Sequence, residues 1–336
     1  MVPVADAPPT LVEYAHEGQE IMEPGFPLDY VGIAWTGAGV AGRVRFGPDG
    51  QWGEWTEIPN GEQLRKGRFL SVVPARKAAS VNVEFLASVS EVQVVALNTT
   101  EGASGAAALE DHGAGRGSPG IPAGGYHVTR AGWGADESLR SRDAKSLRGA
   151  SPAQVITLHQ VAAGCDGLES AALMRAIYFL HTDCERLGDI GYHWLIDGDG
   201  VVYVGSNGGL LTSAAGADRR LVESAAHLAG FNAGNIGIAL MTDCEVGFTP
   251  EVMRQSLVRL LADLVETYGL DPQGQTWYVN PVTGASQFVP VISSHREWTG
   301  STCLGAAIDV AMPAIRASVV SHLTPRDGIA QPCDTP

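Results

Sequence analysis

The chain has 336 residues, of which 45% are hydrophobic and 18% are charged, and its formal net charge is −15. This composition is typical of a folded protein of about two domains and argues against a disordered chain. So negative a chain is a poor partner for nucleic-acid phosphates, and no apolar run approaches the roughly 18 residues of a membrane span.

The first third of the chain shows strand periodicity. From about residue 29, short apolar runs alternate with a period of two, as in Val31, Ile33 and Trp35. Several such runs without a helical period predict a small all-β, sandwich-like domain over residues 1–98. This part has no cysteine and no cluster of histidines or carboxylates, so we expect it to carry no chemistry.

Residues 99–124 are rich in glycine, alanine and serine, a composition that predicts a flexible linker. Residues 324–336 are expected to form a C-terminal tail. The N-terminus lacks the basic and then apolar pattern of a signal peptide, so a secreted chain would already have lost its signal.

Between the linker and the tail, strand-like apolar runs alternate with helical patterns, which predicts an α/β domain over residues 125–323. Buried strands are expected at residues 154–158, 235–241 and 289–292, among others. The predicted helices lie near residues 173–187, 249–268 and 305–322.

One stretch of this domain has the pattern of a metal site. His295 and Cys303 lie eight residues apart, close to a glycine, and zinc binds both imidazole and thiolate. His159 and His295 each follow a short apolar strand, and ligands often gather past strand ends in α/β folds. His159, His295 and Cys303 are therefore a candidate zinc set, although a histidine at a strand end is more often a packed or exposed side chain.

The chain has five cysteines, all in its second half, so one is left over if the other four pair. Cys303 as a zinc thiolate would be that one. Two disulfides among the rest would fit an oxidising compartment.

Five segments resemble motifs of the type 2 N-acetylmuramoyl-L-alanine amidases and peptidoglycan recognition proteins, in matching order over about residues 125–320. They are residues 129–135 (TRAGWGA), 158–162 (LHQVA), 189–205 (beginning DIGYHWLI), 226–238 (beginning AHLAGFN) and 294–305 (beginning SHREW). The β-domain and glycine-rich linker ahead of them are similar to those of secreted actinobacterial members.

The resemblance implies a mixed central β-sheet flanked by helices and a secreted, zinc-dependent cell-wall hydrolase. The bond cleaved would be the amide between N-acetylmuramic acid and the L-alanine of the stem peptide. One zinc ion per chain would be held by His159, His295 and Cys303. Tyr192 would be the catalytic tyrosine, with its phenol on the attacking water or the developing oxyanion. The competing interpretation of Tyr192 is an aromatic residue of the core.

The resemblance also implies further roles. Contacts to a peptidoglycan or muropeptide substrate are expected at His193, His227, Asn232 and Ser301. The expected disulfides join Cys165 to Cys184 and Cys244 to Cys333. The protein is expected to act as a monomer in the cell wall.

Two departures from the family pattern leave the general base open. Ser301 stands where some relatives have a lysine, and Ala239 stands near where others have a glutamate. Glu297 and His193 lie near predicted site residues in the sequence and could be considered for the general base. Of the two, Glu297 is more readily explained as a structural partner. Retention of three ligands and Tyr192 favours an enzyme, whereas the two missing charged groups favour a recognition module that binds muropeptide without cleaving it. A third interpretation makes the β-domain the principal, adhesive part of the protein.

Overall fold

The computed structural model describes eleven segments of the chain: residues 10–15, 20–37, 41–48, 51–65, 67–100, 127–141, 149–162, 169–206, 221–242, 250–299 and 306–323. Five residues with predicted roles lie outside these segments, namely Cys165, Cys244, Ser301, Cys303 and Cys333.

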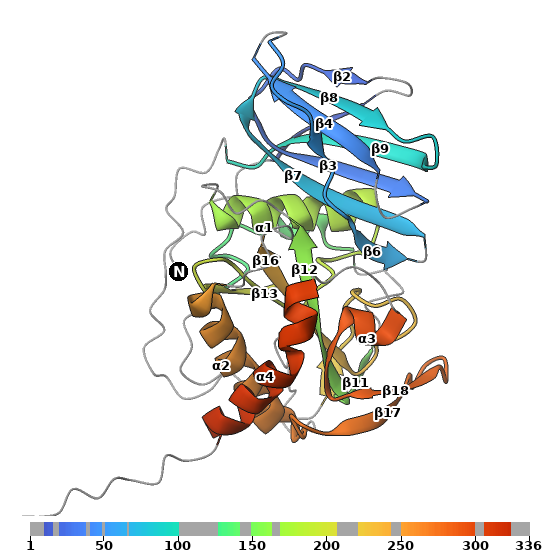
Figure 1. Ribbon diagram of the computed structural model, residues 1–336, viewed down its shortest axis with the longest axis vertical. Helices are drawn as coiled ribbons and strands as arrows, with labels where there is room; N and C mark the ends of the chain where they lie inside the picture. The colour runs from blue at the N-terminus through green and yellow to red at the C-terminus, as the bar shows by residue number, and fades with distance from the viewer. Residues whose placement is uncertain are drawn as a thin grey trace, which may run out of the picture.

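The N-terminal part is a β-domain of two antiparallel sheets, which lies at the top of Figure 1. One sheet has the strand order β1-β9-β3-β7-β6, and the other has the order β2-β8-β4-β5. Val31, Ile33 and Trp35 point into the core between the sheets, as their alternation predicts. The strands are β1 Leu11–Tyr14, β2 Ile21–Met22, β3 Leu28–Thr36, β4 Gly42–Gly47, β5 Thr56–Glu57, β6 Glu62–Arg65, β7 Arg68–Ala78, β8 Ser80–Phe85 and β9 Ser90–Asn98.

The C-terminal part is an α/β domain around a mixed six-stranded sheet, as predicted, with the order β10-β14-β13-β16-β12-β19. Strand β12, next to the edge strand β19, runs parallel to both of its neighbours, and β13 and β14 form an antiparallel hairpin. The strands are β10 His127–Val128, β11 Ala150–Pro152, β12 Val155–Ala162, β13 Trp194–Ile196, β14 Val202–Val204, β15 Leu221–Glu223, β16 Asn235–Thr242, β17 Gln275–Val279, β18 Ser286–Pro290 and β19 Ile292–Ser294. The α-helices are α1 Ser170–Phe179, α2 Glu251–Tyr268, α3 His295–Thr299 and α4 Ala306–Leu323.

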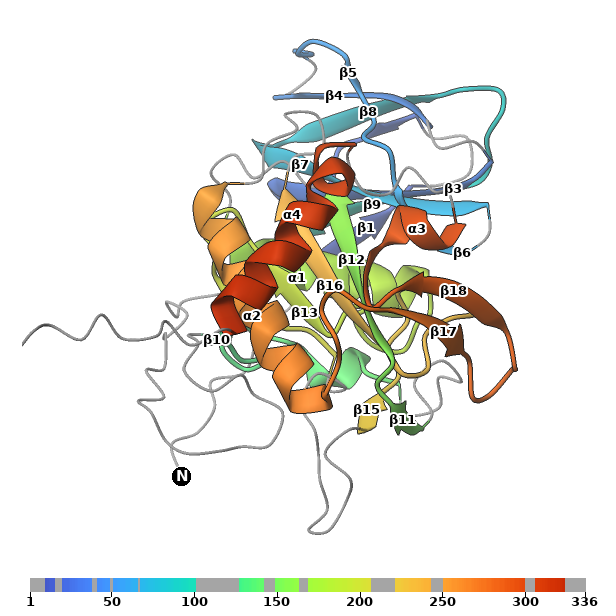
Figure 2. The same cartoon turned by 60° about the horizontal axis from the view of Figure 1, so that its bottom comes forward.

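The two faces of this sheet have different neighbours. Ile156 and Leu158 of β12 share a core with α2 and α4. Because side chains alternate along a strand, His159 and Val161 point to the opposite face, where Val161 packs in a core with α1. Figures 1 and 2 both show α1 on one side of the sheet and α2 with α4 on the other.

Several predicted boundaries are wrong. His159 lies inside β12 rather than past its end. Helix α2 begins at Glu251, after Pro250 as N-cap, and ends before Gly269 as predicted. The expected helix near residues 173–187 stops at Phe179 and continues as a π-helical turn, Leu180–Cys184, in which the Glu185 N–H bonds to the Leu180 carbonyl. Within the described segments, no helix has the length and apolar character needed to cross a bilayer.

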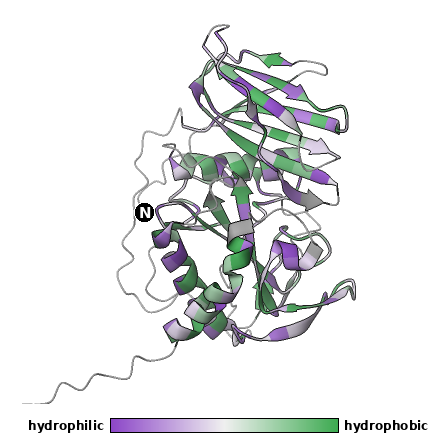
Figure 3. Ribbon diagram, viewed as in Figure 1, coloured by the Kyte–Doolittle hydropathy of each residue, from purple (hydrophilic) through white to green (hydrophobic). Residues whose placement is uncertain are grey.

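Helix α1 is buried on all sides because the β-domain covers the face turned away from the central sheet. Every residue of α1 after Ser170 is buried, the burial expected of a helix that is apolar all round. Tyr30 and Ala34 of β3 join α1 in one hydrophobic core, so the two domains share it. Hydrophobic colour runs through the strands of both domains in Figure 3. Polar contacts add to the apolar ones, since the Thr99 hydroxyl donates to the Ala172 carbonyl and Arg175 donates to the Thr99 carbonyl.

The interface depends on close approach at Gly32, where a β-carbon would overlap the fully buried side chain of Leu180. We therefore expect Gly32→Val to lower the free energy of unfolding by about 1–3 kcal/mol, the usual cost of overpacking. Urea unfolding of the full chain measures the change. Gly25→Val is the control, because nothing lies within 4 Å of a β-carbon there. Equal midpoints for the two variants would contradict the packing argument.

Candidate functional site

Four histidines and a tyrosine form one buried cluster, and each is at most 2% exposed. The ring centroid of His159 lies 4.8 Å from that of His295, 4.9 Å from that of His227 and 5.2 Å from that of Tyr192. His193 lies behind His227, at a centroid distance of 5.7 Å. The fold thus brings His159 of β12, His295 at the start of α3 and Tyr192 just before β13 into one place.

A line of hydrogen bonds fixes which nitrogen of His159 carries its proton. The Asn235 carbonyl can only accept, so Nε2 of His227, at 3.1 Å, is the donor. In a neutral ring, Nδ1 of His227 then has a lone pair, and it accepts from Nε2 of His159 at 2.9 Å. Neutral His159 therefore keeps its lone pair on Nδ1, which is the form that binds a metal.

Burial holds these rings in the neutral state. Loss of hydration lowers the pKa of His227 to about 3 and the pKa of His295 to about 4. The pKa of His159 lies well below 6.5, first because of burial and then because His295, His227 and His193 are near. The cluster therefore offers neutral imidazoles across the neutral pH range.

The backbone around His227 is shaped to present its ring. Asn232 accepts hydrogen bonds through Oδ1 from the backbone N–H groups of His227 and Leu228, at 3.0 and 2.8 Å. The ring lies against Gly237 of β16, where a β-carbon would come within 2.5 Å of it. A glycine at position 237 is thus required for His227 to reach His159.

His193 and His227, two of the predicted substrate contacts, have both ring nitrogens engaged inside the protein. His193 donates from Nε2 to the Glu223 carbonyl and accepts at Nδ1 from the Gly237 N–H, both at 2.9 Å. It thereby joins the end of β15 to β16 and has no ring nitrogen left for a substrate. Asn232 uses its side-chain oxygen to hold the His227 loop, as described above.

Two residues that the sequence motifs do not reveal complete the cluster, and one of them comes from the β-domain. The Tyr192 hydroxyl donates to Oε2 of Glu62, which lies on β6 and is 5% exposed. Nε2 of His181 lies 2.5 Å from Oε1 of the same carboxylate, and Nδ1 of His181 accepts from the Gly191 N–H at 2.9 Å. The β-domain, which is expected to carry no chemistry, thus places Glu62 against Tyr192, the predicted catalytic residue.

The remaining motif residues brace the site. Arg130 donates to the Asp189 carboxylate at 2.9 Å and to the Gly205 carbonyl at 2.6 Å, which ties the segment before Tyr192 to the end of the β13–β14 hairpin. Glu297 accepts from the Ser294 N–H at 2.7 Å and pairs with Arg316 at 2.8 Å. Glu297 is thus committed to holding the start of α3, as its structural interpretation predicts.

The donors fit part of a zinc site. Within the described ranges, no group of three or more His, Cys, Asp or Glu side chains is arranged to hold a metal ion, and the third predicted ligand, Cys303, lies outside them. His159 and His295 are adjacent, neutral and buried, and the second nitrogen of His159 is held by a hydrogen bond, as is usual for zinc-binding histidines. Cys184 is a free thiol, so this structure does not form the predicted Cys165–Cys184 disulfide. The predicted Cys244–Cys333 disulfide stays a prediction, because both residues lie outside the described ranges.

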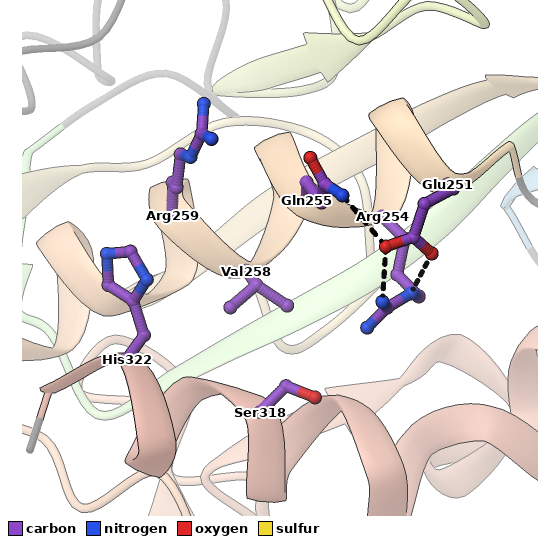
Figure 4. A pocket seen from close by; sticks show the side chains of 7 residues that line it. All are labelled: Glu251, Arg254, Gln255, Val258, Arg259, Ser318 and His322. Carbon is purple, nitrogen blue, oxygen red and sulfur yellow. Dashed lines mark hydrogen bonds and ion pairs between the residues drawn. The ribbon is translucent and has the colours of Figure 1, made fainter.

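A hollow between α2 and α4 lies on the face of the sheet opposite the histidine cluster. It has a volume of about 370 Å³, and Val258, Ser318 and His322 contribute to its lining (Figure 4). The Glu251 carboxylate at its rim is already bonded to Arg254 and Gln255. None of the clustered histidines lines this hollow, so it is separate from the site.

Neutral buried histidines predict acid lability. Burial lowers the pKa of His193 to about 4, while the unfolded chain takes up the proton near 6.5. The unfolded state therefore binds more protons between these values. Stability should be constant above pH 6.5 and fall below it, by about 1.4 kcal/mol per pH unit for each such histidine. Urea unfolding in chelator at pH 7.5 and 5.5 measures this, and His193→Gln should reduce the pH dependence. Equal stability at both pH values would refute the neutral cluster.

Residues 149–306 match the family model of N-acetylmuramoyl-L-alanine amidase. Similar solved structures include the amidase LysC from Clostridium intestinale, at 17% identity and a TM-score of 0.37, covering 52% of this chain and 93% of that one. Drosophila peptidoglycan recognition protein LB has 22% identity and a TM-score of 0.40, with coverages of 55% and 91%.

A third similar structure is the complex of tracheal cytotoxin with the ectodomains of peptidoglycan recognition proteins LCa and LCx, at 23% identity and a TM-score of 0.37, covering 53% of this chain and 89% of that one. No curated protein matches the chain. The resemblance expected from the sequence motifs is thus confirmed at the level of the family model, which residues 149–306 of the α/β domain match.

Proposed function

We propose that this protein is a secreted, zinc-dependent peptidoglycan hydrolase that cleaves the amide between N-acetylmuramic acid and the L-alanine of the stem peptide. The family supports the amidase chemistry. The observation that carries the proposal for this chain is the hydrogen-bonded line from Asn235 through His227 to His159. This line leaves a metal-binding nitrogen on His159 beside His295 and Tyr192.

Zinc would be held by His159, His295 and Cys303, one ion per chain. When bound, it would supply a Lewis acid for the amide carbonyl and lower the pKa of water toward ~7. The chain contributes orientation: His227 holds the His159 ring through Nε2, and Asn232 holds the loop that carries His227. The Glu297–Arg316 pair fixes the first turn of α3, where His295 lies.

Tyr192 is the residue proposed to act on the reacting atoms. Its ring lies against His159, and its hydroxyl is buried, so water that is not part of the reaction is kept from it. Its phenol would contact the attacking water or the developing oxyanion, a role worth a few kcal/mol in comparable sites. Muropeptide is the proposed substrate class, and a monomer in the cell wall is the proposed working state.

The first test is muropeptide cleavage followed by mass spectrometry. The zinc-loaded wild type should release free stem peptide, and Cys303→Ala should bind far less than about one zinc per chain and release none, because two imidazoles alone bind zinc weakly. Cys184→Ala removes the free thiol of the π-helical turn and should keep both zinc and activity. Intact muropeptides after incubation with the zinc-loaded wild type would replace the hydrolase by a recognition module.

The second test concerns His227. Leucine at this position removes the acceptor for Nε2 of His159, and loss of such a partner typically weakens metal binding by about 10–100-fold. His227→Gln has similar volume and can accept from His159 while donating to the Asn235 carbonyl, so it should retain most of the affinity. Competition with a chromogenic chelator measures zinc affinity for both variants. Equal affinities would show that the hydrogen bond to His159 does not matter for the metal.

A further inference from the structure

Among the described residues, Glu62 of the β-domain is the one carboxylate that accepts a hydrogen bond from the Tyr192 hydroxyl. We propose, resting on the function proposed above, that Glu62 acts through Tyr192 as the proton acceptor of the hydrolysis. The site would then be completed by the other domain of the chain. Glu62 is a positioning residue in this proposal, since it reaches the reacting atoms only through Tyr192.

The assignment follows from which groups donate and which accept in the hydrogen bonds around Glu62. The Gly191 N–H bonds to Nδ1 of His181, so Nε2 of a neutral His181 carries the proton and donates to Oε1 of Glu62. Oε2 of the same carboxylate accepts the single proton of the Tyr192 hydroxyl. With that proton engaged, the oxygen of Tyr192 can only accept toward the site. Tyr192 is therefore oriented to receive a hydrogen bond from the attacking water rather than to donate one to an oxyanion.

The surroundings hold Glu62 in this position. Its strand, β6, is the edge of the five-stranded sheet and pairs with β7, and both strands lie against β12. The side chain of Glu62 is 4% exposed, and two hydrogen-bond donors compensate for its burial. Glu297, the other candidate near the site, is bound to Arg316. Ser301 and Ala239, the positions where some relatives carry a lysine or a glutamate, have no charged side chain.

The proton balance of the step is simple. As the water oxygen bonds to the carbonyl carbon, one water O–H bond breaks and its proton passes to the Tyr192 oxygen. The Tyr192 proton passes at the same time to Oε2 of Glu62, and the carbonyl π pair moves onto oxygen. When the C–N bond breaks, the pair returns to re-form the carbonyl. The proton travels back through Tyr192 to the leaving nitrogen, which departs as the free amine of L-alanine.

Glu62→Gln tests the polarity directly. Because His181 must donate from Nε2, the glutamine oxygen should face His181 and its NH₂ group should face Tyr192. That arrangement donates to the Tyr192 oxygen and releases the Tyr192 proton toward the site, the reverse of the native state. We expect kcat on muropeptide to fall by about 100-fold, within the range for general acid–base groups, with KM within about threefold. An unchanged kcat would overturn the proposal, and a raised kcat would overturn it by making Glu62 an inhibitory clamp.

The matched control is Glu185→Gln. Glu185 is 3% exposed at its side chain and pairs with Arg68 across the same domain interface, at 3.0 Å, away from Tyr192. If Glu62→Gln acts only by loosening the interface, the two variants should lose kcat equally, which would overturn the proposal. We expect Glu185→Gln to stay within about twofold of wild type. A wild type without amidase activity would instead sink the proposed function, and the inference with it.

The coupling between Glu62 and Tyr192 can also be measured without turnover, from the thermal unfolding midpoint of the metal-free protein. Tyr192→Phe removes one of the two donors to Glu62, so it should lower the thermal midpoint of the metal-free wild type. In the Glu62→Gln background the same change removes no carboxylate contact and should lower the midpoint much less. Equal shifts in the two backgrounds would mean that Glu62 and Tyr192 are not coupled, and the proposal would fail.

Discussion

The hydrogen bond from Nε2 of His159 to Nδ1 of His227 exists only while the His227 imidazole is neutral, and the rest of the site depends on it. A protonated His227 would have no lone pair at Nδ1 and would repel the His159 N–H. Burial supplies the neutral state, since a charged ring without water is disfavoured. The glycine at position 237 supplies the space, because a side chain there would push the His227 ring away from His159.

The two domains meet through a helix that neither covers alone. One face of α1 packs on the central sheet and the other packs on β3, so its residues are buried almost without exception. The same surface carries polar links, with Arg68 to Glu185 and Glu62 to both His181 and Tyr192. The β-domain is thus part of the structure around the site.

The sequence predicts the parts of this molecule that are set by local pattern. Alternation in β3 and the motifs around His159, Tyr192 and His295 correctly indicate a β-domain, a mixed α/β domain and a clustered pair of histidines. It fails where distant segments decide. Glu62 has no motif of its own, and its contact to Tyr192 spans 130 positions. The π-helical turn that holds His181 depends on packing, and the backbone partners of His193, the Glu223 carbonyl and the Gly237 N–H, come from two segments that only the fold brings together.

The apolar face of β3 also constrains how the chain is made. Tyr30 and Ala34 leave the ribosome long before α1, their cover in the native state. Until α1 is synthesised, the β-domain must wait with this face open to solvent, a situation that favours aggregation or capture by a chaperone. The same face would stay open if the β-domain were transplanted to another protein. The order of synthesis, and not only the final contacts, therefore makes the N-terminal third of this chain dependent on the rest.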